Sequence, residues 1–189
     1  MDTPTPLSIL GLSGSLRTGS YNRAVLRAII ELAPEGVAVA DYDYGDLPLY
    51  NGDLEAAGFP PSAQAFKDRI EAADGLIIVT PEYNRGMPGV LKNALDWGTR
   101  PGGKNSFLRK PVMVTGASPG WQGTIRAQEQ VKDFAIHLGM YLLPMPEVHI
   151  SVVSEKVNAD GVLTDEGTRE SLRKMLGVFA EFVRRFKSP

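Results

Sequence analysis

Short runs of hydrophobic residues alternate along the chain with stretches whose apolar residues recur at helical spacing. The runs have the length of β-strands. Residues 75–80 are apolar at nearly every position, which is typical of a central parallel strand covered on both faces. In this way the pattern predicts five strands, at residues 7–12, 37–41, 75–80, 110–117 and 140–143.

Apolar residues three or four positions apart predict a helix after each of the first four strands and one more near the end of the chain. The first spans about residues 22–33. Ser62 is expected to begin the second helix, and Pro88 suits the first turn of the third. The fourth should end at Gly139, and Asp165 should cap the last.

Strands and helices in this order predict a doubly wound α/β fold, a five-stranded parallel sheet with helices on both faces, because each crossover is right-handed. No repeat or linker interrupts the pattern, so one domain is expected over residues 1–189. Residues 45–61 are expected only to connect two elements. The loops after strands one, three and four should meet at the carboxyl ends of the strands, where open α/β sheets bind ligands.

Residues 13–22, which follow the first predicted strand, read Ser-Gly-Ser-Leu-Arg-Thr-Gly-Ser-Tyr-Asn. Small residues allow backbone N–H groups to surround an anion, the hydroxyls donate, and the next helix presents its positive end. Arg17 adds a charge and forked donors. The loop therefore predicts a phosphate-bearing ligand. The alternative is a polar turn without a ligand.

Three well-known phosphate sites do not match this loop. It lacks the G-x-x-x-x-G-K-[ST] pattern of nucleoside-triphosphate loops, and its glycines lack the G-x-G-x-x-G spacing of dinucleotide sites. The chain has no cysteine, which excludes a cysteine phosphatase. A loop that holds a phosphate monoester without cleaving it suits a mononucleotide cofactor.

The loop after the third strand, residues 81–89, contains two prolines and two glycines that restrict its backbone. It can present N–H and C=O groups along the edge of a planar heterocycle, with Tyr83 or Asn84 beside its face, and this suits a flavin. The alternative is a tight turn in which Glu82 is solvated and Tyr83 packs.

The loop after the fourth strand, residues 117–123, is small and polar, so Ser118 and the glycines can approach the other side of the same ring. Trp121 is open to four interpretations. It shields the flavin, lines the substrate pocket, lies in a subunit contact, or is a packed surface residue.

Composition narrows the function further. The net charge of −2, from 20 basic and 22 acidic residues, argues against a nucleic-acid-binding protein. No apolar run approaches the ~20 residues of a membrane span, and Met1–Pro6 has no signal-peptide pattern, so a cytoplasmic protein is expected. Without cysteine, and with two isolated histidines, no metal site is expected.

Three segments, residues 14–22, 80–84 and 88–97, resemble the NADPH-dependent FMN reductase family, especially its quinone, chromate and azo reductase branch. The resemblance runs from the first strand to the last helix. It implies a flavodoxin-like fold with strand order 2-1-3-4-5, non-covalently bound FMN, and a homodimer or homotetramer.

By resemblance, three groups of residues hold FMN. The residues expected to hold the FMN phosphate are Ser15, Arg17, Ser20 and Asn22, and Tyr21 lies in the same motif. The residues expected to hold the isoalloxazine ring are Pro81, Glu82, Tyr83 and Asn84. Ser118 and Gly120 are expected near the ring or the ribityl chain.

Three charged residues are singled out by comparison with the family. Arg85 stands where relatives often have an uncharged residue, and it either meets an anionic substrate or nicotinamide phosphate or is a plain rim arginine. Residues comparable to Arg126 and Glu147 join subunits in chromate-reducing relatives. In this chain they are either interface residues or ordinary surface charges.

The function implied is a two-step reductase in which NADPH or NADH, as a transient donor, reduces bound FMN, and an acceptor such as a quinone, chromate, an azo compound or a flavin then takes the electrons. The chemistry would take place on FMN, so no catalytic side chain is expected. The alternatives are a flavodoxin-type electron carrier and a redox-sensing binding module.

Overall fold

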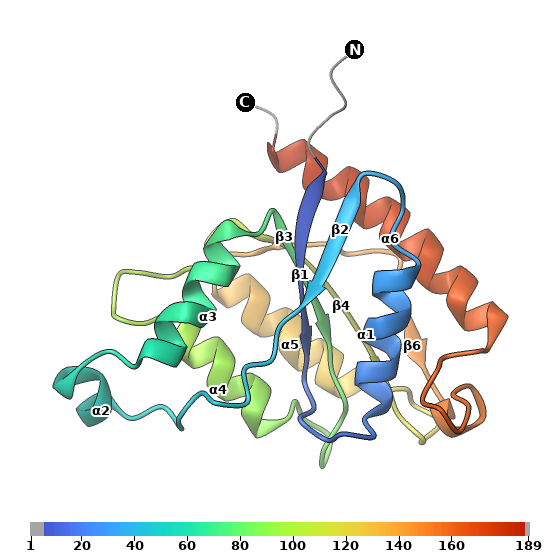
Figure 1. Cartoon of the computed structure of the whole chain (residues 1–189), viewed down its shortest axis with the longest axis horizontal. Helices are drawn as coiled ribbons and strands as arrows, with labels where there is room; N and C mark the ends of the chain where they lie inside the picture. The colour runs from blue at the N-terminus through green and yellow to red at the C-terminus, as the bar shows by residue number, and fades with distance from the viewer. Residues whose placement is uncertain (1–5, 188–189) are drawn as a thin grey trace.

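The computed structural model describes residues 6–187, and its centre is a parallel sheet with strand order β2-β1-β3-β4-β5 (Figure 1). The prediction of a flavodoxin-like, doubly wound α/β fold with order 2-1-3-4-5 is therefore confirmed. The five strands are β1 Leu7–Ser13, β2 Val37–Asp41, β3 Gly75–Val79, β4 Pro111–Ala117 and β5 Tyr141–Leu142.

A sixth short strand, β6 (His149–Ile150), also pairs in parallel with β4. Strand β5 pairs with the beginning of β4, where Pro111 lies opposite Tyr141. Strand β6 pairs with its end, where Ala117 lies opposite Ile150. The carboxyl end of β4 thus gains a partner that is not among the five predicted strands.

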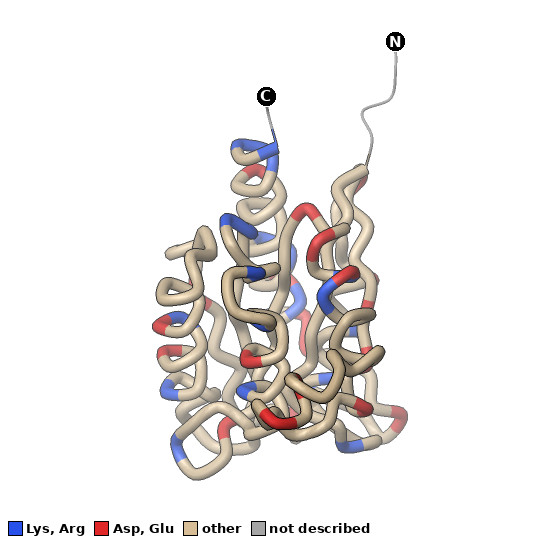
Figure 2. Tube along the Cα trace, turned by 90° about the vertical axis from the view of Figure 1, so that its left-hand side faces the viewer, with Lys and Arg blue, Asp and Glu red and all other residues tan. Residues whose placement is uncertain are grey.

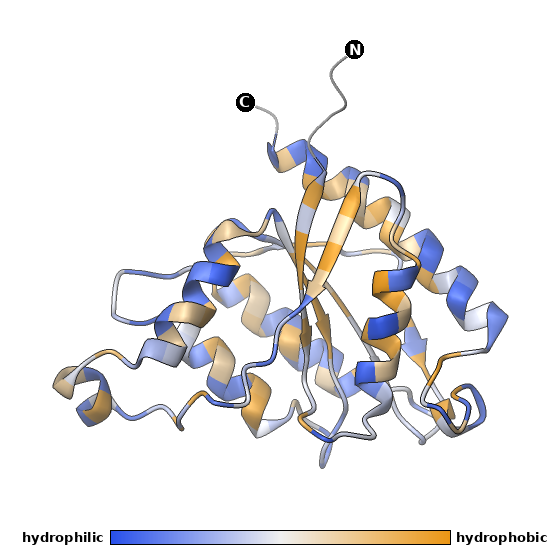
Figure 3. Cartoon of the chain, in the orientation of Figure 1, coloured by the Kyte–Doolittle hydropathy of each residue, from blue (hydrophilic) through white to orange (hydrophobic). Residues whose placement is uncertain are grey.

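Five helices cover the two faces of the sheet (Figure 1). Residues of β3 alternate between the two hydrophobic clusters: Ile77 packs on the α1 and α6 side, and Ile78 on the α3, α4 and α5 side. Both faces of β3 are therefore buried, as the continuous apolar run predicts. Figure 3 shows that hydrophobic residues dominate β1 and β2, whereas the outer helices carry both hydrophobic and hydrophilic residues. The helices are α1 Tyr21–Glu31, α3 Pro61–Ala72, α4 Gly89–Gly98, α5 Ile125–His137 and α6 Glu166–Lys187.

Three local predictions were wrong. Pro88 is the N-cap residue of α4 and does not lie in its first turn. The connection over residues 45–61 contains a short helix, α2 (Gly52–Ala57), which has no buried residue and begins where the Asn51 side chain accepts from the N–H of Asp53. Helix α3 begins at Pro61 rather than at Ser62, and the residue before it, Pro60, makes no side-chain cap. Proline suits this first position because its fixed φ is already helical and because the N–H that it lacks would have no partner within the helix.

The predicted cap of the last helix is present. Asp165 Oδ1 accepts from the backbone N–H of Thr168 at 2.8 Å and from its hydroxyl at 2.5 Å. Both bonds lower the pKa of the Asp165 carboxyl below its ordinary value, and the bond from the Thr168 hydroxyl has the larger effect.

Replacing Asp165 by alanine is expected to lower the free energy of unfolding by about 1 kcal/mol, since it removes the cap of α6. Because the pKa is lower in the folded state, the stabilisation is complete above the unfolded pKa and is lost as the pH falls through the folded value, below about pH 4. Urea unfolding at pH 7 and at pH 3 measures both effects. Asp160→Ala, at an exposed turn, is the control; equal losses in the two variants would contradict the assignment.

Basic and acidic residues are interspersed over the face seen in Figure 2, without a large region of one sign. Within residues 6–187 no helix is both long and apolar enough to cross a membrane.

Candidate functional site

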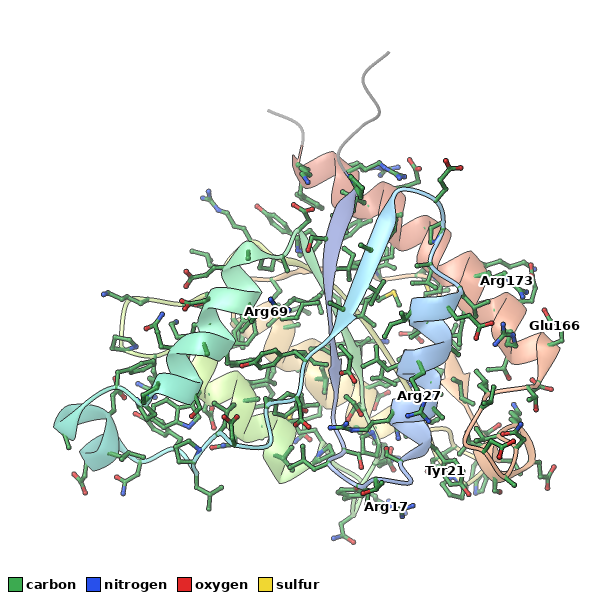
Figure 4. All side chains as sticks on the ribbon, viewed as in Figure 1. Arg17, Tyr21, Arg27, Arg69, Glu166 and Arg173 are labelled. Atoms are coloured by element: carbon green, nitrogen blue, oxygen red, sulfur yellow. The ribbon has the colours of Figure 1, made fainter. Side chains whose placement is uncertain are left out.

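A pocket lies at the carboxyl ends of β1, β3 and β4, where the loops that follow these strands come together. We call them the first loop (residues 14–20), the second loop (residues 80–88) and the third loop (residues 118–124). Arg17 and Tyr21 lie at this end of the sheet, next to the start of α1 (Figure 4). The lining residues are Ser15, Arg17, Ser20, Tyr21, Asn22, Pro81, Glu82, Tyr83, Ala117, Ser118 and Pro119.

The first loop ends in the cap of α1. Ser20 is extended, its Oγ accepts from the N–H of Arg23 at 3.3 Å, and its carbonyl accepts from the N–H of Ala24 at 3.1 Å. The N–H groups of Tyr21 and Asn22 precede the first intrahelical bond and have no acceptor within residues 6–187. The positive end of α1 therefore offers two free donors at the pocket.

The first and second loops touch each other. Ser15 Oγ and the Tyr83 hydroxyl are 3.4 Å apart. A Cβ atom at Gly14 would lie 3.0 Å from Cδ of Pro81, so the close approach of the two loops favours glycine there. Residues from separate parts of the chain therefore form one wall.

The second loop is held by a tight turn. The N–H and C=O groups of Tyr83 and Gly86 bond to each other in both directions, at 3.0 and 3.1 Å. Asn84 and Arg85 between them have φ values of 51° and 65°. Positive φ at both central positions is the geometry of a type I′ turn, which asparagine tolerates well. Both side chains are exposed and do not line the pocket.

Glu82 lines the pocket and also links two elements. Its Oε2 accepts from the N–H groups of Arg126 and Ala127 at 3.1 and 3.2 Å, in the first turn of α5. The carboxylate satisfies donors that the helix leaves unpaired and lies at its positive end. Glu82 therefore fixes the second loop against α5, a role that sequence reasoning did not assign to it.

Replacing Glu82 by alanine is expected to lower the free energy of unfolding by about 1–2 kcal/mol, because the two N–H groups lose their acceptor. Glu82→Gln keeps an oxygen in place and should lose about half as much. Urea denaturation of both variants provides the comparison. An alanine variant as stable as the parent would show that the bonds contribute nothing.

In the third loop, Ser118 lines the pocket, and its Oγ accepts from the N–H of Gly120 at 3.0 Å. Gly120 itself is exposed and lies outside the lining. Trp121 is 81% exposed, so within one chain it neither packs on the surface nor lines this pocket.

The Asn22 side chain fastens the end of β4, directly before the third loop, to α1. Its Nδ2 donates to the carbonyl of Ala117, and its Oδ1 accepts from the N–H of the same residue, both at 2.9 Å. The amide is buried and both of its polar atoms bond to Ala117, whereas the backbone N–H of Asn22 has no acceptor within residues 6–187. A pocket ligand can therefore accept from the backbone N–H of Asn22 and from the one Nδ2 hydrogen that is not bonded to Ala117.

The structure thus brings together nine of the eleven residues named from the sequence, and leaves Asn84 and Gly120 at the margin. Sequence reasoning passed over Ala117 and Pro119 as site residues. Both lie beside Ser118 at the end of a buried strand, Ala117 as the last residue of β4, and this position is the signal that could have identified them.

The pocket has the donors that a flavin mononucleotide requires. Two free N–H groups, the Ser15 and Ser20 hydroxyls and the Arg17 guanidinium gather at the start of α1, which suits a phosphate dianion. The one carboxylate of the lining, Glu82, is turned to the N-terminus of α5 and so does not oppose an anion. The residues therefore fit the cofactor.

Arg126 and Glu147 are the two charged residues that were expected either at a subunit interface or as ordinary surface charges. Glu147 is bonded within its own chain. It accepts from Lys132 and lies 3.3 Å from Nε2 of His149. The Lys132 ammonium is the main reason that the pKa of Glu147 is lowered. Arg126 is exposed on α5.

Residues 7–155 match the family described as NADPH-dependent FMN reductase. An NAD(P)H-dependent FMN reductase of Pseudomonas aeruginosa is 44% identical over 181 residues, which cover 96% of this chain and 97% of that protein. A 2-hydroxy-1,4-benzoquinone reductase of a Burkholderia species is 42% identical over 178 residues, which cover 94% of this chain and 97% of that protein.

Among solved structures, FerB, a flavoenzyme NAD(P)H:(acceptor) oxidoreductase from Paracoccus denitrificans, superposes with a TM-score of 0.88 at 39% identity. The match covers 95% of this chain and 98% of FerB. Sequence and fold agree with these proteins over nearly the whole length, and this chain belongs to the NADPH-dependent FMN reductases.

Proposed function

We propose that this protein is an NAD(P)H-dependent FMN-containing oxidoreductase that reduces quinones or related acceptors. The observation that carries the proposal is the pocket formed by three loops, in which free N–H groups, hydroxyls and Arg17 meet at the start of α1. The curated relatives named FMN reductase and quinone reductase support it.

In this proposal the first loop binds the phosphate through Arg17 and the Ser15 and Ser20 hydroxyls, and the start of α1 binds it through the N–H groups of Tyr21 and Asn22. The second loop orients the isoalloxazine ring with the backbone from Pro81 to Asn84, and Ser118 and Gly120 approach it from the third loop. FMN, when bound, would supply the redox chemistry by which two electrons pass from NAD(P)H to the acceptor. The protein's side chains bind and orient, and none acts as a nucleophile.

We propose that residues 1–189 work as a single FMN-binding domain, in the cytoplasm, as a homodimer or homotetramer. A chain without cysteine requires no oxidising compartment. The 81% exposure of Trp121 supports an assembly, since protein interfaces are enriched in tryptophan.

Anaerobic mixing of the FMN-loaded protein with NADPH or NADH tests the proposal. Rapid bleaching of the flavin absorption, followed by its return when a benzoquinone is added, is the expected result. A yellow colour that persists in the presence of either nicotinamide would indicate an electron carrier instead and would overturn the proposal.

A further inference from the structure

Residues 43–50, between β2 and α2, have no role in the site described so far, yet hydrogen bonds tie their beginning to the end of β1 and, through Arg23, to the first loop. The Tyr44 hydroxyl donates to the carbonyl oxygen of Ser13 at 2.6 Å. Arg23 of α1 donates from Nε to the carbonyl oxygen of Ser15 at 3.3 Å and from Nη2 to Oδ2 of Asp43 at 3.1 Å. None of Arg23, Asp43 and Tyr44 lines the pocket.

The Arg23 contact sets the direction of one peptide group of the first loop, and the Tyr44 contact holds the Ser13–Gly14 peptide at the end of β1, whose N–H donates to the carbonyl oxygen of Val79 at 2.8 Å. In a trans peptide the C=O and N–H point in opposite directions. The Ser15 carbonyl is turned toward Arg23, so the N–H of Leu16 points the other way. A carbonyl oxygen turned toward a phosphate would repel it, whereas N–H groups form the concave surfaces that bind anions.

The three residues are also held in the states that this arrangement needs. The N–H of Gly45, at 2.9 Å from Asp43 Oδ1, and the Arg23 guanidinium lower the pKa of the Asp43 carboxyl, so it is ionised at neutral pH. Burial raises the pKa of Tyr44, so its hydroxyl remains a donor. Asp43 thereby restrains Arg23 beside the Ser15 carbonyl.

We propose that Asp43, Arg23 and Tyr44 are positioning residues for phosphate binding, which hold the first loop in its anion-binding form through the carbonyls of Ser13 and Ser15 without touching the ligand. This inference rests on the proposed function, since it assigns a support to the loop that holds the FMN phosphate. It makes the segment after β2 a fourth component of the site.

The variant Asp43→Asn separates positioning from direct charge. It removes the restraint on Arg23 but leaves the positive charge in place. Positioning predicts that the Kd for FMN rises roughly two- to fivefold, the equivalent of one exposed ion pair. The Kd for riboflavin, which has no phosphate, should stay unchanged in titrations followed by flavin fluorescence. Tyr44→Phe should show the same difference between the two flavins.

Asp46→Asn is the matched control, because Asp46 is exposed on the same segment and its substitution removes the same negative charge. Its FMN affinity should equal that of the parent. If Asp43→Asn binds FMN as tightly as the parent or more tightly, Arg23 acts on the phosphate directly and the positioning role is wrong. Equal weakening of FMN and riboflavin would indicate general damage and would also overturn it.

A measurement without flavin keeps this inference distinct from the proposed function. Amide hydrogen exchange over residues 14–19 should be faster in Asp43→Asn than in the parent and in Asp46→Asn, because the first loop loses a restraint. Unchanged exchange in the ligand-free protein would contradict the inference. Failure of the parent protein to bind FMN would instead overturn the proposed function, and this inference with it.

Discussion

Replacing Gly116 by alanine is expected to destabilise the protein by about 3 kcal/mol or more. Gly116 lies near the carboxyl end of β4, and a Cβ atom there would overlap the carbonyl oxygen of Thr80 and Oγ1 of Thr124. The Thr80 oxygen belongs to the backbone and cannot rotate away. The end of β3 would have to move away from β4, and with it the second and third loops that form the pocket.

Gly177→Ala is the matched control for this prediction. Gly177 lies inside α6, and an added Cβ would meet nothing within 4 Å. Alanine there should raise the free energy of unfolding by about 0.5–1 kcal/mol, because glycine is the poorer helix former. Urea unfolding measures both variants. A Gly116→Ala protein as stable as the parent would show that β3 and β4 are not held at this separation.

Replacing Arg17 by alanine is expected to raise the Kd for FMN roughly tenfold to a hundredfold, the equivalent of about 1.5–3 kcal/mol for a charge-assisted hydrogen bond. Arg17 lines the pocket beside the start of α1, and its Nη2 donates to the carbonyl of Gly19 at 3.0 Å. That bond holds the side chain near the loop while other guanidinium N–H groups remain free. Fluorescence titration with FMN gives the affinity.

The loss of affinity in Arg17→Ala should depend on the phosphate of FMN. Riboflavin affinity should change little in Arg17→Ala, and Arg69→Ala, an exposed arginine on α3, should leave both affinities unchanged. If Arg17→Ala retains the FMN affinity of the parent, Arg17 is not a phosphate ligand. The free N–H groups of Tyr21 and Asn22 would then have to provide the binding.

The sheet was predictable because its signal is local and repeated. Both faces of β3 are buried, so residues such as Ile77 and Ile78 can all be apolar, and right-handed crossovers leave few topologies for strands that alternate with helices. Helix α2 was missed because none of its residues is buried, which removes the apolar periodicity on which the prediction depends. The start of α3 was placed one residue late because proline, not a side-chain cap, begins it.

The position of the pocket was predictable for a different reason: parallel strands bring their carboxyl ends to one edge, so Ser15, Tyr83 and Ser118 could be expected to meet. What their side chains bond to was not. Glu82 turns to the N-terminus of α5, and the Asn22 amide closes on Ala117, partners separated from them by 44 or more positions in the sequence. Contacts of this kind depend on the packed structure, and no spacing along the chain reveals them.

Calorimetric titration of the unmodified protein with FMN and with riboflavin tests the central claim most directly. The account predicts that FMN binds at least about a hundredfold more tightly than riboflavin, since two N–H groups, two hydroxyls and Arg17 at the start of α1 meet its phosphate. Equal affinities for the two flavins, or no binding of either, would contradict it.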